Sequence, residues 1–130
     1  MSKTKIKVTI LKEEQGYSAY ASLKNSFIAT EADTLEGLLT HFLEAVNTTF
    51  ENKGIMYSLD DLLFTYDLAS FFEYYKIINA KALSERIGMS QSLLAQYING
   101  IKKPSSAQIK RILTGIQQVG KELAEVQFIG

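Results

Sequence analysis

Apolar and polar positions alternate from Lys5 to Lys12, and two groups of turn residues divide the segment that follows. The stretch from Lys5 to Lys12 predicts a strand with one buried face. Residues 13–16 then supply a turn, residues 17–23 a second strand, residues 24–26 a second turn and residues 27–31 a third strand. Gly16 and Asn25 are able to adopt the positive φ that tight turns often need, so this region predicts two β-hairpins.

The spacing of apolar residues becomes helical from Asp33 onward. Asp33 is followed three residues later by Glu36, a capping-box pattern that predicts the start of a helix. Gly54 is expected to end it. The apolar stripe that this helix should lay on the sheet consists of Leu35, Leu38, Leu39, Phe42, Leu43, Val46 and Phe50.

The segment from Leu62 to Tyr66 is short enough to be a buried strand or the end of a helix, and periodicity does not separate the two. Its aromatic and β-branched content favours a fourth strand. We place a domain boundary directly after it. The predicted fold class is α+β: a small antiparallel sheet with one packed helix in residues 1–66, then an all-α domain of four to five helices in residues 67–130.

Four helices with recognisable caps are expected in the second domain. The caps are Asp67, Asn79, Ser90 and either Ser105 or Ser106, while Gly88 ends the second helix and Met89 fills the space before the third. The expected inner positions are Leu68, Phe71, Phe72 and Tyr75 in the first helix, Leu83, Ser84 and Ile87 in the second, Leu94 and Tyr97 in the third, and Ile109, Ile112, Leu113, Ile116 and Val119 in the fourth.

The outer face of the third helix, residues 91–99, predicts the recognition of base pairs in duplex DNA. An amide side chain can bond to adenine N6 and N7, a serine hydroxyl to either kind of base edge, and alanine permits close approach or contact with a thymine methyl. The residues expected to contact bases are Gln91, Ser92, Ala95 and Gln96. Those expected to contact phosphates are Ser90, Asn99, Lys102, Lys103 and Lys81.

The distribution of charge supports this prediction when the two halves of the chain are counted separately. The formal net charge is zero, but residues 1–67 hold six basic and ten acidic side chains, whereas residues 68–130 hold eight basic and four acidic ones. Between Lys76 and Lys121 only Glu85 is acidic. A basic concentration of this kind is typical of a phosphate-binding surface.

Composition excludes several kinds of chemistry. With no cysteine and one histidine, the chain cannot form a disulfide framework, a thiolate zinc site or a cysteine nucleophile. His41 lies off the apolar stripe and is interpreted as a surface residue. No apolar run approaches the roughly 20 residues that span a bilayer, and no signal segment is evident. We expect a cytoplasmic protein without a cofactor or metal ion.

The motif Leu-small-x-x-Ile-Gly-x-Ser at residues 83–90, followed by Gly-x-Lys-x-Pro-Ser at residues 100–105, resembles the XRE, or phage-repressor-like, helix-turn-helix family. The resemblance covers roughly 40 residues. Ala80 and Ile98 depart from residues that are frequent in that family. The resemblance implies a domain from about Asp67 to Val119 that binds duplex DNA, normally as a dimer, through the helix that begins at Ser90.

Residues 8–12, 16–21 and 32–38 are similar to HicB-like antitoxins. That resemblance implies a partial ribonuclease H-like sheet-plus-helix domain, which in the family precedes a DNA-binding domain. It also implies that the N-terminal domain masks a small RNA-cleaving toxin. Members of that family commonly have a Pro-x-Leu-x-Gly stretch before the third strand. At this place the present chain has Leu-Lys-Asn-Ser-Phe, residues 23–27.

Three functions follow as alternatives. The leading one is an antitoxin that represses its own operon, and the second is a stand-alone XRE-type regulator whose N-terminal domain serves dimerisation or sensing. The third is a ribonuclease H-like nuclease, which would need clustered carboxylates; Asp60 and Asp61 are adjacent, and neighbours on a strand point to opposite sides. We expect no enzymatic activity. A dimer interface is expected at Tyr74, the sheet edge or residues 123–129.

Overall fold

The computed structural model describes residues 4–130, which form two compact units. The first unit ends at Tyr74 and the second runs from Tyr75 to Gly130. The division therefore falls after Tyr74, whereas the sequence placed the boundary after residue 66. The helix that follows the fourth strand belongs to the sheet unit and not to the helical unit, for reasons that its hydrogen bonds supply.

The first unit contains a four-stranded sheet in the order β3-β2-β1-β4. The strands are β1 (Ile6–Lys12), β2 (Tyr17–Ser22), β3 (Phe27–Ala32) and β4 (Leu62–Tyr66). Both predicted hairpins and the fourth strand are confirmed, since β1 pairs antiparallel with β2 and β2 with β3. The prediction of a purely antiparallel sheet is wrong, because β4 runs parallel to β1, with Ile6 opposite Leu62 and Ile10 opposite Tyr66.

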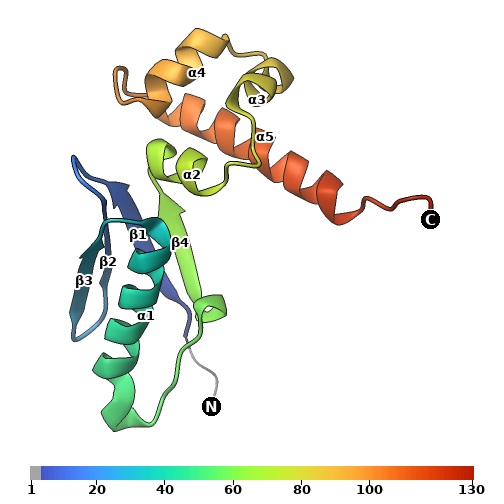
Figure 1. Ribbon diagram of the computed structural model, residues 1–130. Coiled ribbons are helices and arrows are strands. Elements are labelled where there is room, and N and C mark those ends of the chain that lie inside the picture. Colours follow the sequence, from blue (N-terminus) through green and yellow to red (C-terminus); the bar gives the residue numbers. More distant parts are fainter. Residues whose placement is uncertain (1–3) are drawn as a thin grey trace. The chain divides into compact units, whose positions relative to one another are not determined.

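The parallel pairing follows from the connection that precedes β4. Helix α1 (Leu35–Phe50) and a long loop lie between β3 and β4, which gives the chain the crossover that a parallel neighbour requires. Figure 1 shows α1 lying along one face of the sheet. The alternation of side chains within β4 indicates which face of the strand is buried but not the direction of the strand. The parallel direction of β4 could therefore not be predicted from the sequence.

The two hairpin turns differ from each other in their backbone conformation. Gly16 has φ +75°, and a Cβ at this position would collide with the carbonyl oxygen of Ala32, so glycine is required there. Asn25 was expected to adopt a positive φ as well, but no residue other than glycine does so in the described part of the chain. The second turn closes instead through a bond from the Leu23 amide to the Ser26 carbonyl, 2.7 Å long.

The N-terminal cap of α1 is Thr34, and the predicted capping box of Asp33 and Glu36 is wrong. The Thr34 hydroxyl accepts a hydrogen bond from the Gly37 amide at 3.0 Å. A glycine at that position has no side chain to return the bond, so a reciprocal box cannot form. At the other end, a short 3-10 helix, η1 (Glu51–Lys53), continues from α1 and stops at Gly54, whose φ of 66° confirms its role as a helix terminator.

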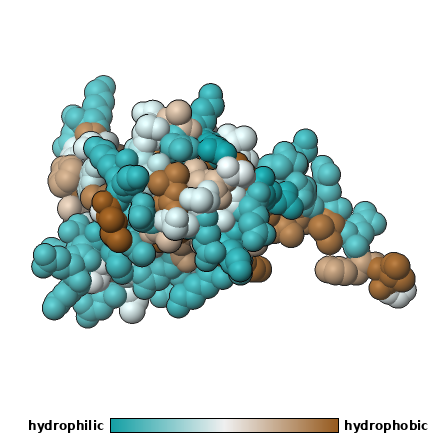
Figure 2. Space-filling model, turned by 90° about the horizontal axis from the view of Figure 1, so that it is seen from above, coloured by the Kyte–Doolittle hydropathy of each residue, from teal (hydrophilic) through white to brown (hydrophobic). Residues whose placement is uncertain are grey.

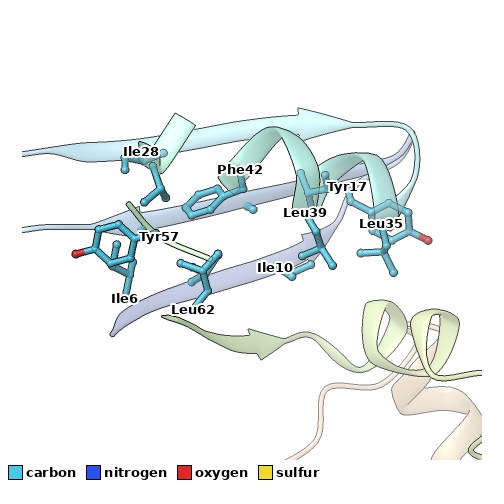
Figure 3. Close-up of a cluster of buried hydrophobic side chains, with 14 residues drawn as sticks. Ile6, Ile10, Tyr17, Ile28, Leu35, Leu39, Phe42, Tyr57 and Leu62 are labelled. Carbon is cyan, nitrogen blue, oxygen red and sulfur yellow. The ribbon is translucent and has the colours of Figure 1, made fainter. Parts of the chain in front are cut away.

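The core of the first unit lies between α1 and the sheet. Figure 3 shows Leu35, Leu39 and Phe42 of α1 directed at side chains of the strands. Of the predicted stripe, Leu43 and Phe50 are half-buried and the other members are buried. Asn47 of α1 also fixes the loop that leads to β4, because its side chain accepts from the Tyr57 amide at 2.7 Å and donates to the Tyr57 carbonyl at 3.1 Å.

Helix α2 (Leu68–Tyr74) is attached to the sheet through Asp67. One carboxylate oxygen accepts from the Ser70 amide at 2.9 Å and caps the helix, as predicted, while the other accepts from the Lys12 amide of β1 at 2.8 Å. Near the end of α2, the Lys12 ammonium donates to Glu73 at 2.9 Å. These bonds explain why α2 belongs to the first unit.

The apolar side of α2 differs from the predicted inner face. Phe71 and Tyr74 contact the ring of Tyr66 at the end of β4, with ring centroids 6.1 Å and 6.4 Å apart. Tyr75 lies beyond the end of the helix and is exposed. The prediction that Tyr75 lies on the inner side of the first helix is therefore wrong, while Phe71 is half-buried and packs on the Tyr66 ring.

The second unit consists of α3 (Ala80–Ile87), α4 (Gln91–Ile98) and α5 (Ser106–Ala124). Asn79, Ser90 and Ser105 cap these helices through hydrogen bonds from the Ala82, Leu93 and Gln108 amides, which confirms the predicted caps and decides for Ser105 over Ser106. The small core holds Leu83, Ser84, Met89, Leu94 and Ile112.

Helix α5 buries less of its apolar surface than the sequence predicted. Ile112 is buried, and Ile116 and Val119 are half-buried, but Ile109 and Leu113 are 41% and 49% exposed. The helix is also longer than expected and reaches Ala124. No helix in residues 4–130 combines the length and the apolar character needed to cross a membrane.

Replacing Asp67 with alanine should lower the free energy of unfolding of the first unit by about 1–2 kcal/mol, because a helix cap and a bond to β1 are lost together. Urea unfolding followed by tyrosine fluorescence measures this. Asp60→Ala is the matched control, since the Asp60 side chain is exposed. Equal loss in both variants would contradict the assigned role of Asp67.

Candidate nucleic-acid interface

The turn between α3 and α4 sets the direction in which α4 leaves α3. Gly88 ends α3 in the left-handed conformation, with φ +70°, and the next amide, that of Met89, donates to the Ser84 carbonyl at 2.9 Å. Met89 is buried, as predicted, and Ser90 begins α4. An L-residue at position 88 would be strained, so the sequence Gly-Met-Ser encodes a fixed corner.

Arg111 of α5 secures this corner from the other side. Its guanidinium donates to the Ile87 carbonyl at 3.0 Å and to the Gly88 carbonyl at 2.7 Å, two groups that the end of α3 leaves without helical partners. The sequence analysis counted Arg111 only among the basic side chains. Its separation of more than 20 residues from the turn left no local signal of this role.

Two further contacts hold α3 against α5. A Cβ at Gly115 would collide with Cγ2 of Ile87, so the glycine permits the close approach of the two helices. Arg86 donates to Glu122 at 2.8 Å. That hydrogen bond lowers the pKa of the Glu122 carboxyl below its ordinary value and raises the pKa of Arg86 further, with both side chains open to solvent.

The outer face of α4 carries no charge. Gln91, Ser92 and Ala95 are exposed and Gln96 is half-buried, while Leu94 on the opposite side is buried. The structure thus brings the four residues predicted to contact bases to one helix. Helix N-terminal residues on a face of this kind have the size and hydrogen-bonding groups that fit a major groove.

The turn that follows α4 brings lysines close to the end of that helix. The amides of Ile101 and Lys102 both donate to the Gln96 carbonyl, at 2.9 Å and 3.2 Å, and Gly100 has φ +74°. Lys102 and Lys103 are exposed beside the C-terminal end of α4. The remaining residues predicted to contact phosphates, Ser90, Asn99 and Lys81, are exposed as well.

Comparison with known proteins identifies this part of the chain. Residues 76–119 match the family model described as Helix-turn-helix. This segment, about a third of the chain, is similar to helix-turn-helix domains. The match supports the XRE part of the resemblance, and with it DNA binding and transcription regulation. No curated protein and no solved structure matches the chain.

The family match starts later in the chain than the predicted domain. The match begins at Lys76, beyond α2, whereas the analysis of caps and apolar spacing started the domain at about Asp67. The matched segment covers α3, α4 and most of α5. Local helical spacing could not distinguish a helix of this domain from one that packs on the sheet.

Charge in the second unit favours contact with a polyanion. Residues 75–130 hold eight basic and three acidic side chains, and those before residue 75 hold six and eleven. Arg86 and Arg111 are occupied within the unit, whereas Lys76, Lys81, Lys102, Lys103, Lys110 and Lys121 are exposed. The second unit therefore combines an uncharged face of α4 with exposed lysines on neighbouring segments.

The carboxylates considered for a nuclease lie outside any strand. Asp60 and Asp61 belong to a short 3-10 helix, η2 (Leu59–Asp61), and Asp61 accepts hydrogen bonds from the Ser58 amide and hydroxyl. Within residues 4–130, no three histidine, cysteine or acidic side chains are grouped so that they could hold a metal ion. His41 is exposed, as expected.

Gly115→Ala should lower the free energy of unfolding of the helix-turn-helix domain by about 1–3 kcal/mol, because the added methyl group overpacks the contact with Ile87. This loss outweighs the gain of about 0.5–1 kcal/mol that alanine normally brings to a helix. Thermal unfolding monitored by circular dichroism measures the change. Adding Ile87→Leu, which removes Cγ2, should restore part of the stability; a more stable Gly115→Ala variant would contradict the packing.

Proposed function

We propose that the chain is a sequence-specific transcriptional repressor whose α4 enters the major groove of its operator. The exposed, uncharged face of α4 carries this proposal, since Gln91, Ser92, Ala95 and Gln96 can read base edges without competing for phosphates. The lysines at positions 81, 102 and 103, together with Ser90 and Asn99, bind the sugar–phosphate backbone on either side. One domain reads only a few base pairs, so the functional species is a homodimer on a palindromic site.

In its fuller form, the proposal makes the chain the antitoxin of a HicAB-like system that represses its own operon. The first unit then masks a small RNA-cleaving toxin. Three antiparallel strands followed by a helix and a parallel fourth strand support the partial ribonuclease H-like assignment. Since proteins that bind RNA are commonly basic, the acidic excess of the first unit supports such a partner.

The sheet offers a surface for that partner on the face opposite α1. Within residues 4–74, no helix covers this face, which Figure 1 shows bare. Tyr20 and Phe27 are exposed on it and stack with ring centroids 6.0 Å apart, and Glu31 lies on the same side of β3. An exposed aromatic pair with acidic neighbours favours a protein ligand that combines apolar and basic side chains.

The exposed pair of Tyr20 and Phe27 is also compatible with a second function, that of a stand-alone regulator. A stand-alone regulator would use this sheet face for association with another copy or for sensing, with no toxin involved. The family match, which is confined to residues 76–119, is equally compatible with that function. A partner test on the sheet face separates the two.

Titration of the purified protein against its own upstream DNA tests the repressor function. The affinity for this DNA should fall by about a thousandfold or more between 50 and 200 mM salt if each dimer neutralises roughly six to ten phosphates. The double variant Lys102→Ala, Lys103→Ala should weaken binding to all DNA sequences by the same factor and make the affinity less dependent on salt. Gln91→Ala should cost about 1–3 kcal/mol, mainly at one base pair of each half-site.

Retention that is unaffected by salt, or a Gln91→Ala variant that loses affinity equally for specific and unrelated DNA, would contradict groove docking by α4. Thr114→Ala serves as the control, because its side chain is exposed on α5 and outside the proposed interface.

The antitoxin function predicts that a small basic protein encoded beside this chain co-purifies with it and loses its ribonuclease activity on binding. Phe27→Asp should abolish that inhibition and leave DNA retention intact, because Phe27 is 65% exposed on the open sheet face. Thr48→Asp, on the exposed side of α1, is the matched control. A neighbour that neither binds nor cleaves RNA would favour the stand-alone regulator.

A further inference from the structure

A second face of α5, distinct from the one that packs on α3, is apolar and exposed. Its members recur at alternating steps of four and three residues, which is the spacing of paired helices. Leu113 is 49% exposed and Leu123 58% exposed. We call this face the α5 seam; it consists of Ile109, Leu113, Ile116, Gly120 and Leu123.

The C-terminal tail extends this apolar surface beyond the helix. The last helical bonds join the amides of Glu125 and Val126 to carbonyls of α5, and Phe128 and Ile129 lie fully or almost fully exposed beyond them. Figure 2 shows a hydrophobic end on the part of the chain that projects from the unit. A group of exposed apolar side chains of this kind commonly marks an interaction surface.

We propose that the α5 seam is the interface of a two-fold symmetric homodimer in which the two α5 helices pair in opposite directions. The proposal deepens the repressor function, because a palindromic operator needs two helix-turn-helix domains related by a two-fold axis. It commits to a second copy of this chain as the occupant of the seam.

Gly120 gives the pairing its register. A Cβ at this position would have no atom within 4 Å, so packing within the chain does not require glycine there. Glycine inside a helix nevertheless costs about 0.5–1 kcal/mol relative to alanine. Opposed helices that cross midway between positions 116 and 120 place Ile116 over Gly120 of the partner subunit, where the missing methyl group leaves room for it.

The same register pairs the remaining seam residues with one another. Leu113 comes opposite Leu123 of the partner subunit, and these two side chains have similar exposed fractions. Ile109 then lies near the partner's tail, which carries the exposed Val126 and Phe128. Burial of each seam side chain therefore has a counterpart in the second copy, as a two-fold interface demands.

Charge selects the opposed direction. The first half of α5 contains Lys110 and Arg111 and no acid, whereas its end carries two acids, Glu122 and Glu125, and one base, Lys121. Antiparallel pairing brings Lys110 close to Glu125 of the partner subunit and sets opposite helix dipole ends side by side. Parallel pairing would place like charges and like dipole ends together.

Disulfide cross-linking tests the register, since the chain contains no cysteine of its own. Leu113→Cys with Leu123→Cys in one chain should give a covalent dimer under mild oxidation. Positions 113 and 123 lie about 15 Å apart along a helix, too far for a bond within one chain. Each single variant should remain uncross-linked, because its cysteine would lie a similar distance from its copy in the partner. Efficient cross-linking of either single variant would overturn the antiparallel register.

Sedimentation velocity tests the interface without any substitution by cysteine. The wild-type chain should sediment as a dimer and Leu113→Glu as a monomer whose circular dichroism spectrum shows that it is folded. Thr114→Glu, on another side of α5, should remain a dimer. Gly120→Ala should raise the dissociation constant at least tenfold. The proposal would be overturned if the wild-type chain were a monomer, which is the result expected if the first unit or another protein covers the seam. A dimeric Leu113→Glu variant would overturn it as well. A dimer that fails to bind its operator would uphold the interface and contradict the repressor function alone.

Discussion

The contact between Arg111 and the corner of α3 and α4 holds in place the helix that we propose reads DNA. The end of α3 leaves carbonyl groups that no helical amide can reach, and the Arg111 guanidinium satisfies those of Ile87 and Gly88 together. Because these are the last residues before the turn, Arg111 ties α5 to the corner from which α4 starts. A basic side chain that a count of charges assigns to phosphate is thus used to orient the neighbouring helix.

Asp67 plays the corresponding part at the end of the first unit. Its two carboxylate oxygens serve two partners, the start of α2 and the end of β1. This arrangement makes α2 an extension of the sheet unit, and both the second unit and the family match begin after it. A residue that caps a helix and accepts from a strand therefore helps to join that helix to the sheet unit.

Local signals in the sequence predicted local structure well. Asn79, Gly88, Ser90 and Ser105 act through residues that lie within five positions of them, and each has its predicted role. The base-reading candidates share one helix face for the same reason, since a helix of known start fixes the direction of every side chain in it. The identity of the N-cap of α1 was missed because Asp33 and Thr34 are both good caps, and only the backbone conformation chooses between them.

Features that depend on distant partners were not predictable in this way. The parallel direction of β4 is set by a crossover, the role of Arg111 by a turn more than 20 residues earlier, and the exposure of Leu113 by the small size of the core it was expected to join. In each case the residue type was compatible with two environments, and tertiary structure selected one of them. Periodicity reports that a helix has an apolar face, but not what that face contacts.

The arrangement of charge separates affinity from specificity in this chain. Lysines stand before and after α4, while the exposed face of α4 itself holds amide, hydroxyl and methyl groups. In the proposed complex the lysines, which bind phosphates of any sequence, would hold the domain on any duplex, and only the neutral face would distinguish one sequence from another. A face of four short side chains offers too few contacts to select a site in a genome by itself. Selectivity then has to come from a second copy held at a fixed distance, and a rigid helix such as α5, anchored to the reading helix through Arg111, is suited to transmit that constraint from a dimer interface to the DNA.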